Sequence, residues 1–487
     1  MKHALLALAL WLPSGAQMNT SPHVSPMAGR WFAGDAAGLT KQLAQANDAA
    51  RKRQGMAAPR KQLAGLIVPH AGIEFSGVVA AEAWRLAAAG AQSRTIILLA
   101  FSHKGGVKGV VSPHVSGFKT PLGTLAVNRN VVGELGFPLA DETALCDHSL
   151  ENQLPFLHGL VGAAGFVPLY VGEMSAAERQ AAARKLAARA AAGDLIVAST
   201  DFTHHGKSYG YEPFGEGKEL PEKLHERAQE SFEHVGSLDV ALFERFLRST
   251  GDTMCGVDPV RLLMAAMRAL ETRRGGVYMS TVDYLNSGDL TRDWSTAVSY
   301  GALAFYPASA YTVGERDRAA LLQHARATLD DAHPGGLAAK SVEFEQRTGV
   351  FVTIKKQGEL RGCIGTLSPR ADVWSTVADR TLAAARSDPR FPPLTSAEGP
   401  VTLEVSLMTP LKLLGDWHAW KPGMGGVLTM DDHGGLFLPQ VAAENKWGRE
   451  EFLENLSLKA GLQREAYRKP AARLYVFEAQ VFGEPAQ

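Results

Sequence analysis

The sequence predicts two domains of different class, an α/β domain followed by an α+β domain. In the first, short apolar runs typical of buried strands alternate with alanine-rich stretches typical of helices, a pattern that favours a mostly parallel sheet with helices on both faces. The length of 487 residues exceeds that of one ordinary domain. Because the composition changes near residues 306–316, we expect the α/β domain over residues 26–308 and the α+β domain over residues 315–485.

The elements of the α/β domain follow from local patterns. Aliphatic and β-branched residues dominate three runs that predict buried strands, at residues 66–68, 95–101 and 194–200. Stretches rich in Ala, Leu and Arg predict helices at residues 78–91 and 176–192, and Asp258-Pro259 begins a third helix. Residues 117–123 indicate a turn, with strands expected after it at residues 124–127 and 298–306.

The α+β domain begins with an amphipathic helix expected at residues 315–329. A hairpin is predicted next, with strands at residues 350–354 and 360–365 joined through Gln357-Gly358. Three further apolar runs predict strands, at residues 401–408, 435–438 and 474–481.

The charge balance of the chain indicates which classes of binding partner it does not favour. Lys and Arg together number 50, as do Asp and Glu, so nothing favours nucleic acid or an anionic membrane surface. No stretch is long and apolar enough to predict a membrane span. Residues 1–25 are expected to be a signal peptide or an extension from an upstream start. We expect a cytoplasmic protein, or a secreted or periplasmic one if Met1–Ala16 is a true signal peptide.

Histidine and aspartate follow the three apolar strands of the first domain. His70 and His103 come after the first two strands, and Asp201 and His204 come after the third. Ligand sites of open α/β sheets lie at the carboxyl ends of strands, so these side chains are expected to share one site. Cys255 precedes a helix start, where we expect a lowered thiol pKa.

Imidazole and thiolate are ligands of iron, copper and zinc, so His70, His103 and Cys255 form a candidate metal set. The alternative is that each histidine has only a structural role. Asp201 and His204 are expected to act as a pair in which the carboxylate orients an imidazole or one group is a general acid or base. His205 is an equal candidate for the inward-facing ring.

A second polar cluster, Asp147, His148 and Glu151, lies in a segment that otherwise predicts burial. One interpretation is a helix N-cap followed by a capping acid. The other, which we favour, places these residues behind the metal ligands, because burying so many polar groups without a role is costly.

These motifs resemble the Memo family over residues 28–306. The resemblance is carried by Pro-His70-Ala-Gly, Phe-Ser-His103, Asp-His148-Ser-Leu-Glu-x-Gln-Leu-Pro, Ser-Thr-Asp201-Phe-Thr-His204 and Cys255-Gly-x-x-Pro. It implies a fold like that of the LigB-type extradiol dioxygenases, which use non-haem Fe(II), with His70, His103 and Cys255 as metal ligands and Asp201 and His204 in the pocket. Those dioxygenases carry a carboxylate where this chain has a cysteine, a difference that weakens the case for ring cleavage. Ala-Phe before Ser-His103 and Lys104 after it also depart from the common family pattern.

In the second domain, strand alternation predicts Arg361 and Cys363 on one face. Cys363 is a candidate nucleophile or, equally, a small core thiol, and Arg361 could hold an anion or a backbone carbonyl. Leu-Arg-Gly-Cys363-Ile-Gly, Ser-Asp-Pro-Arg-Phe391, Glu404-Val-Ser-Leu and Gly-Gly-Leu-Phe-Leu-Pro439 resemble the AMMECR family over residues 316–482. Proteins of both families are encoded with a radical-SAM enzyme in the AmmeMemoRadiSam system, so the resemblance implies a radical-SAM partner.

The sequence therefore predicts a metal-dependent oxidoreductase with one Fe(II) or Cu ion and an unknown small-molecule or peptide ligand. Two alternatives remain open. One is a non-enzymatic scaffold that binds a metal or a peptide and works with the radical-SAM partner. The other is a cysteine-based transferase centred on Cys363.

Overall fold

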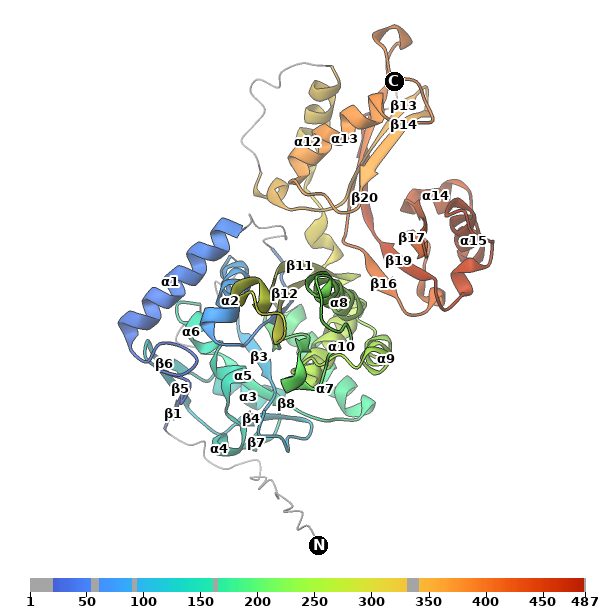
Figure 1. The fold of residues 1–487 in the computed structure, drawn as a ribbon. Coiled ribbons are helices and arrows are strands. Elements are labelled where there is room, and N and C mark those ends of the chain that lie inside the picture. Colours follow the sequence, from blue (N-terminus) through green and yellow to red (C-terminus); the bar gives the residue numbers. More distant parts are fainter. Residues whose placement is uncertain (1–20, 54–60, 90–93, 161–164, 331–340, 486–487) are drawn as a thin grey trace. The chain divides into compact units, whose positions relative to one another are not determined.

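The computed structural model describes residues 21–53, 61–89, 94–160, 165–330 and 341–485 (Figure 1). They divide into two compact units, one formed by the described residues up to Pro307 and the other by those from Ala308 onward. The segment Met1–Ala16, in which a signal peptide is expected, lies outside the described residues.

A nine-stranded sheet forms the centre of the first unit. Its strands follow the order β10-β12-β2-β9-β3-β8-β4-β7, and β11 pairs with β12. The strands are β2 (Gly65–Val68), β3 (Ile96–Ala100), β4 (Val110–Pro113), β7 (Leu139–Ala140), β8 (Val167–Val171), β9 (Leu195–Ser199), β10 (His204–His205), β11 (Val277–Asn286) and β12 (Ala297–Pro307). A small separate sheet contains β1 (His23–Val24), β5 (Gly117–Thr120) and β6 (Gly123–Ala126).

Helices cover both faces of the large sheet, α1 and α2 on one side and α7 and α10 on the other (Figure 1). Small side chains allow close contact: a Cβ on Gly65 of β2 would lie 2.9 Å from the Met267 sulfur of α10. The helices of this unit are α1 (Ala36–Arg53), α2 (Ile73–Ala88), α3 (Arg129–Leu135), α4 (Glu142–Leu145), α5 (His148–Glu151), α6 (Leu154–Leu157), α7 (Ala176–Ala191), α8 (Leu220–Gly236), α9 (Val240–Thr250), α10 (Val257–Arg274) and α11 (Ser287–Thr291).

The predicted α/β class is confirmed, and the parallel part of the sheet is its centre. Strands β2, β9, β3 and β8 run parallel to one another, whereas β12 pairs antiparallel with β2 and β4 pairs antiparallel with β8. Every residue of β2, β3 and β9 is buried, as the apolar runs predict. The carboxyl ends of these three adjacent strands therefore lie at one edge.

One local prediction in this unit is wrong. Residues 117–123 are not all turn, because β5 and β6 pair antiparallel and only Pro121 and Leu122 connect them. The polar and glycine residues that indicated a turn are compatible with β5 because it belongs to a short sheet with an exposed Lys119.

The second unit contains two four-stranded sheets, ordered β14-β13-β15-β20 and β16-β19-β17-β18. Its strands are β13 (Val350–Lys356), β14 (Glu359–Thr366), β15 (Thr402–Met408), β16 (Lys412–Leu414), β17 (Gly425–Met430), β18 (His433–Phe437), β19 (Arg473–Phe477) and β20 (Ala479–Gly483). Its helices are α12 (Glu315–Leu329), α13 (Val373–Arg386), α14 (Pro439–Glu444) and α15 (Arg449–Lys459). The α+β class is confirmed.

The single strand expected at residues 474–481 is two strands, β19 and β20, which belong to different sheets. They separate at Glu478, whose backbone exchanges hydrogen bonds with Thr409 at 2.9 and 3.0 Å. Apolar residues continue on both sides of Glu478, so the sequence pattern alone gave no sign of this change of sheet.

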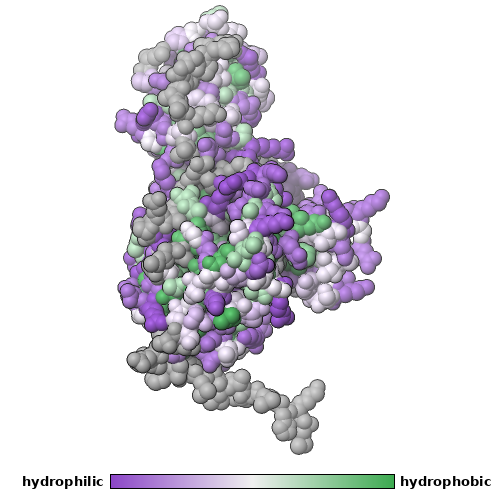
Figure 2. Space-filling view, turned by 90° about the vertical axis from the view of Figure 1, so that its left-hand side faces the viewer, coloured by the Kyte–Doolittle hydropathy of each residue, from purple (hydrophilic) through white to green (hydrophobic). Residues whose placement is uncertain are grey.

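Within the described residues, no helix combines the length and apolar character that crossing a bilayer requires. On the face drawn in Figure 2, hydrophilic residues predominate and hydrophobic ones occur in small separate groups. Scattered apolar residues of this kind are normal on protein surfaces.

Candidate metal centre

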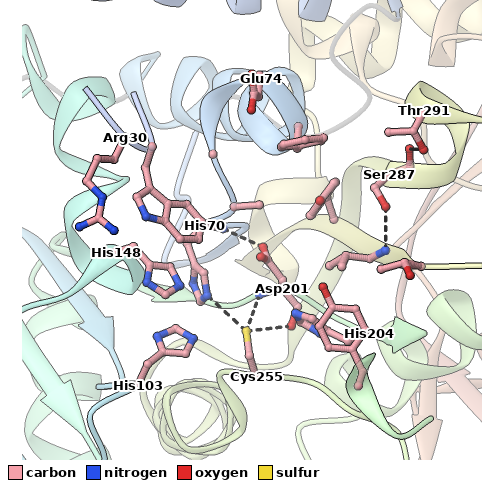
Figure 3. Close-up of a pocket in the computed structure, with 18 residues that line it drawn as sticks. Arg30, His70, Glu74, His103, His148, Asp201, His204, Cys255, Ser287 and Thr291 are labelled. Carbon is pink, nitrogen blue, oxygen red and sulfur yellow. Dashed lines mark hydrogen bonds between the residues drawn. The ribbon is translucent and has the colours of Figure 1, made fainter. Parts of the chain in front are cut away.

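A cavity of about 480 Å³ opens at the carboxyl ends of the central strands (Figure 3). Five of its polar lining residues are those that the sequence proposes for metal binding or proton transfer: His70, His103, Asp201, His204 and Cys255. Its other lining residues include aromatic and hydroxyl side chains, which sequence reasoning did not identify: Trp31, Phe75, Tyr209, Tyr300, Ser287, Thr291 and Thr296.

His70 lies just past the end of β2 and is 2% exposed. Its Nδ1 lies 3.0 Å from the Ser199 hydroxyl, which itself donates to the Ser149 carbonyl at 2.5 Å. Because that hydroxyl proton is already used, Ser199 accepts from Nδ1–H, and the lone pair of His70 is on Nε2. Nε2 faces the Cys255 sulfur at 3.3 Å. This tautomer is the one a metal ligand requires.

Two buried amides hold the backbone around His70. The Asn152 amide donates to the His70 carbonyl at 2.7 Å, and the Gln153 amide donates to the Pro69 carbonyl at 2.7 Å. Sequence reasoning missed both residues. The sequence does contain a signal for them, because two amide side chains between Leu150 and Leu154 would be costly to bury without hydrogen-bond partners.

His103 follows β3, and its side chain is 36% exposed. Asp147 Oδ2 accepts from both the backbone N–H of His103, at 2.5 Å, and its Nδ1, at 3.0 Å. Burial is the largest influence on Asp147 and would raise its pKa, but hydrogen bonds from His103 and Ser149 outweigh burial and lower the pKa. The carboxylate thus remains charged and directs Nε2 of His103 away from itself.

Asp147 both begins a helix and contacts a candidate ligand. Its Oδ1 caps α5 by accepting from the Ser149 N–H at 2.9 Å, while Oδ2 orients His103. One carboxylate therefore fixes the helix start and a candidate ligand together.

His148 lies against the candidate ligands rather than behind them. Its ring stacks between His103, at a centroid distance of 4.0 Å, and Trp31, at 4.2 Å. Figure 3 shows His148 beside His103 and His70. Burial, followed by the charges of His103 and His70, lowers the pKa of His148 to about 3. Burial, followed by His103, likewise lowers the pKa of His70 to about 3. Both rings are neutral at physiological pH and can offer a lone pair.

The lowered pKa of His148 predicts an acid-dependent loss of stability. Between pH 6.5 and about 3 the unfolded chain takes up a proton at this residue and the folded chain does not, so stability falls as the pH falls through this window. His148→Phe keeps a flat ring and removes the titration. We expect chemical unfolding at pH 7 and pH 5 to show a pH-dependent loss smaller by roughly 1 kcal/mol in the variant. An equal loss in both proteins would contradict a neutral imidazole at His148.

Cys255 precedes the N-cap of α10, but the expected lowering of its pKa is wrong. Burial, followed by the Asp201 carboxylate, raises the pKa of the thiol above its usual range. The hydrogen bond from the Asp201 backbone N–H to the sulfur, at 3.2 Å, only partly opposes this rise. A thiol in this environment becomes a thiolate only when a cation compensates the charge.

Asp201 is 4% exposed and accepts from the His70 N–H at 2.8 Å. Burial, partly opposed by His204, raises the pKa of Asp201 to about 6. Nδ1 of His204 lies 2.8 Å from the Phe202 carbonyl and 3.0 Å from the Thr253 carbonyl, so it carries the proton and Nε2 is free to accept one. His204 is the ring that lines the cavity, whereas His205 is buried and is not among the lining residues.

The donor atoms form two overlapping groups that could each hold an ion. One group joins His70, His103 and His148, and the other joins His70, Asp201 and Cys255; within each group the ligand atoms lie within 4.8 Å of one another. His103 and Cys255 belong to different groups. A single ion bound by His70, His103 and Cys255 would therefore sit beside His70 and draw the other two ligands toward it.

Glu151 is the member of the predicted site that the structure places elsewhere. Its carboxylate faces His23, with Oε1 3.2 Å from the His23 Nε2, and not the cavity. The four-residue helix α5 therefore sends Asp147 and His148 to one side and Glu151 to another.

In the second unit, Arg361 and Cys363 are held by separate partners. Arg361 makes two hydrogen bonds of 2.7 Å with the carboxylate of Glu398, and the Cys363 N–H donates to Asp388 at 2.8 Å. A register shift between β13 and β14 at Arg361 interrupts the alternation from which we expected a shared face. Burial raises the pKa of the Cys363 thiol, which does not favour a reactive thiolate.

Close packing against helix α13 explains why this motif has a glycine at position 362. A Cβ at this position would lie 2.2 Å from the Ala384 carbonyl oxygen of α13. We expect Gly362→Ala to destabilise the second unit by about 1–3 kcal/mol, because the helix must move away from the sheet. Denaturant unfolding of the full chain tests this, with Gly358→Ala as a comparison at a position that has open space but a positive φ. Unchanged stability in Gly362→Ala would contradict the packing.

Comparison with known proteins gives two family matches. The family model for Memo-like protein matches residues 24–304, and that for AMMECR1 matches residues 319–482. A MEMO1 family protein of Methanopyrus kandleri is 31% identical over 252 residues, which cover 50% of this chain and 83% of the relative. A memo-1 homolog of Caenorhabditis elegans is 28% identical over 293 residues, 58% of this chain and 82% of the relative.

Among solved structures, an uncharacterized protein of Pyrococcus horikoshii is similar to part of the chain. It is 31% identical, with a TM-score of 0.31, and the match covers 34% of this chain and 90% of that protein.

Proposed function

The chain belongs to the Memo family and carries an AMMECR1 domain C-terminal to the Memo-like unit in the sequence, and on this premise we propose that its N-terminal cavity is a mononuclear Fe(II) or Cu centre of an oxidoreductase. The observation that carries the proposal is the pairing of His70 Nε2 with the Cys255 sulfur at 3.3 Å in the cavity at the strand ends. Nitrogen and sulfur donors together suit Fe(II) and copper better than hard cations such as Mg²⁺.

The donor set supports this choice. His70 has its lone pair on the nitrogen that faces Cys255, and His103 is oriented by a charged carboxylate. His148, with a ring nitrogen within 4.8 Å of both other imidazoles, is an additional ligand candidate. The neutral state of His70 and His148 at physiological pH means that neither must lose a proton before binding a metal.

The remaining polar residues would handle substrate and protons. When bound, the metal would supply one-electron chemistry and a site for a small oxygen-containing ligand. Asp201, whose pKa is about 6, can give or take a proton near neutrality, and His204 can accept one at Nε2. The cavity volume of about 480 Å³ matches a small molecule or one side chain of a peptide.

Asp147 is the residue we expect to orient a ligand without touching the metal. Asp147→Asn keeps the shape but removes the charge that holds the Nδ1 proton of His103. We expect a roughly 10–100-fold loss of Fe(II) or Cu affinity. Metal titration of the folded variant measures this loss, and Asp388→Asn in the second unit is the matched control. Wild-type affinity in Asp147→Asn would contradict the orienting role.

Oxygen consumption tests the activity. Protein loaded with Fe(II) or Cu under anaerobic conditions is mixed with oxygen and a panel of catechols and thiols. We expect metal-dependent uptake with at least one compound, and a loss of that uptake in His204→Ala. A loaded protein that consumes no oxygen across the panel would favour a metal- or peptide-binding scaffold instead.

The fusion of the two families in one chain supports a shared process for both units. We infer that the AMMECR1 unit acts on the same substrate or partner as the metal centre, and that a radical-SAM protein is that partner. Co-purification of the full chain with a co-expressed radical-SAM protein from the same organism tests this association, and independent elution of the two would contradict it.

A further inference from the structure

We propose a second metal site in the N-terminal unit, formed by His23, Cys146 and Glu151 and suited to a zinc-class divalent cation. The ligand atoms of these three residues lie within 4.8 Å of one another. They share no residue with the groups around His70, and none of the three lines the cavity of Figure 3.

Three separate segments bring these donors together. His23 lies on β1, which pairs in parallel with β5, and its ring packs edge-on against Phe118 at a centroid distance of 5.5 Å. Cys146 ends α4, and Glu151 ends α5. Figure 1 shows β1 beside β5, with α4 nearby. His23 lies 128 residues before Glu151 in the sequence, so the cluster depends on the folded chain.

Glu151 provides the independent sign of a missing cation. Its side chain is fully buried, and Oε1 is bound by His23 at 3.2 Å. Its second oxygen, Oε2, has no hydrogen-bond partner among the described residues and is shielded from solvent. Buried carboxylate oxygens are normally satisfied, because the loss of water around a charge must be compensated. A cation held jointly with Cys146 would satisfy this oxygen.

Cys146 is enclosed by the protein and has a hydrogen-bond donor beside its sulfur. It is 3% exposed, and the Tyr170 hydroxyl donates a hydrogen bond to it. The phenol is fully buried and its own pKa is raised, so it stays a neutral donor. It is therefore placed to donate to a metal-bound sulfur.

The chemistry of the donors selects the ion. One imidazole nitrogen, one thiolate sulfur and one carboxylate oxygen are the three ligand types that Zn²⁺ accepts in tetrahedral sites, with the fourth position left for water. Two anionic ligands would neutralise the divalent charge. A bound ion would tie β1 to the segment that contains Asp147, and Asp147 orients His103 in the first centre.

Zinc stoichiometry in a protein without the first centre tests the proposal. The full chain is made with His70→Ala, Cys255→Ala and Cys363→Ser, so that Cys146 is its one remaining thiol. It is loaded with Zn²⁺, desalted and measured by mass spectrometry. Co²⁺ is then substituted, and thiolate-to-cobalt charge transfer in the near ultraviolet is recorded.

We expect one equivalent of zinc and a cobalt–thiolate band in this triple variant. Adding Cys146→Ser should remove the band, and adding His23→Ala at the partly exposed end of the cluster should weaken zinc binding more than about 10-fold. Absence of retained zinc in the folded triple variant, or a band that survives Cys146→Ser, would overturn the proposal.

If the triple variant does not fold, the second site can be tested in the wild-type background instead. Here His23→Ala alone should lower the zinc content of the full chain by one equivalent, and an unchanged content would overturn the second site. This outcome is independent of iron or copper at His70, so the two proposals can fail separately.

Discussion

Replacing His70 or Cys255 with alanine should lower the affinity of the N-terminal unit for Fe(II) or Cu by roughly 100-fold or more, since even the loss of an orienting neighbour of a ligand typically costs 10–100-fold. His70 contributes to both donor groups, so His70→Ala should be the more damaging change. Its removal leaves neither group with three donors. Cys255→Ala removes the soft ligand and should weaken copper more than iron.

The measurement is anaerobic metal titration of the full chain, with metal content by mass spectrometry and folding checked by circular dichroism. Cys363→Ser is the matched control, because it removes a thiol from the second unit. We expect wild-type iron or copper binding in the control. Equal binding by His70→Ala, Cys255→Ala and the control would mean that the ligands have been assigned wrongly.

The second large effect is the pH dependence of metal binding. Because the pKa of the Cys255 thiol is raised above its usual range, the thiol is protonated at neutral pH and must release its proton when a metal binds. His70 and His148 are already neutral and release none. The affinity should therefore increase up to about tenfold for each unit of rising pH near neutrality.

Below pH 6 the slope should become steeper if Asp201 is a ligand, because its carboxyl group then also carries a proton. Cys255→Asp separates the two contributions, since it replaces the thiol with the kind of ligand that the resembling dioxygenases use. We expect a shallower dependence for this variant between pH 6.5 and 8. A wild-type affinity that does not vary with pH would contradict binding through a thiol that is protonated before the metal binds.

Much of the fold could be predicted because burial leaves a direct mark on sequence. Fully buried parallel strands require uninterrupted apolar runs, and β2, β3 and β9 all have them. Strand β11 gave a weaker signal because it pairs at one edge of the sheet, where several of its residues are only partly buried. The division of residues 474–481 between two sheets depends on Thr409, which is distant in sequence.

The candidate site was predictable only in its strand-end residues. His70, His103 and Asp201 follow strands whose order in the sheet the α/β pattern makes plausible, so their meeting could be anticipated. The stacking of His148 on Trp31 could not, because it joins segments more than a hundred residues apart. The raised pKa of Cys255 was also missed, since a helix start suggested the opposite and burial outweighs it.

The account depends most on one ion held between His70, His103 and Cys255. Anomalous diffraction at the iron and copper edges, from crystals of protein purified without oxygen, tests this directly. We expect a single strong peak in the N-terminal cavity, within bonding distance of the His70 Nε2 and the Cys255 sulfur and with His103 completing the set. Crystals of metal-loaded protein with no peak there, or with a peak bound by other residues, would contradict the account.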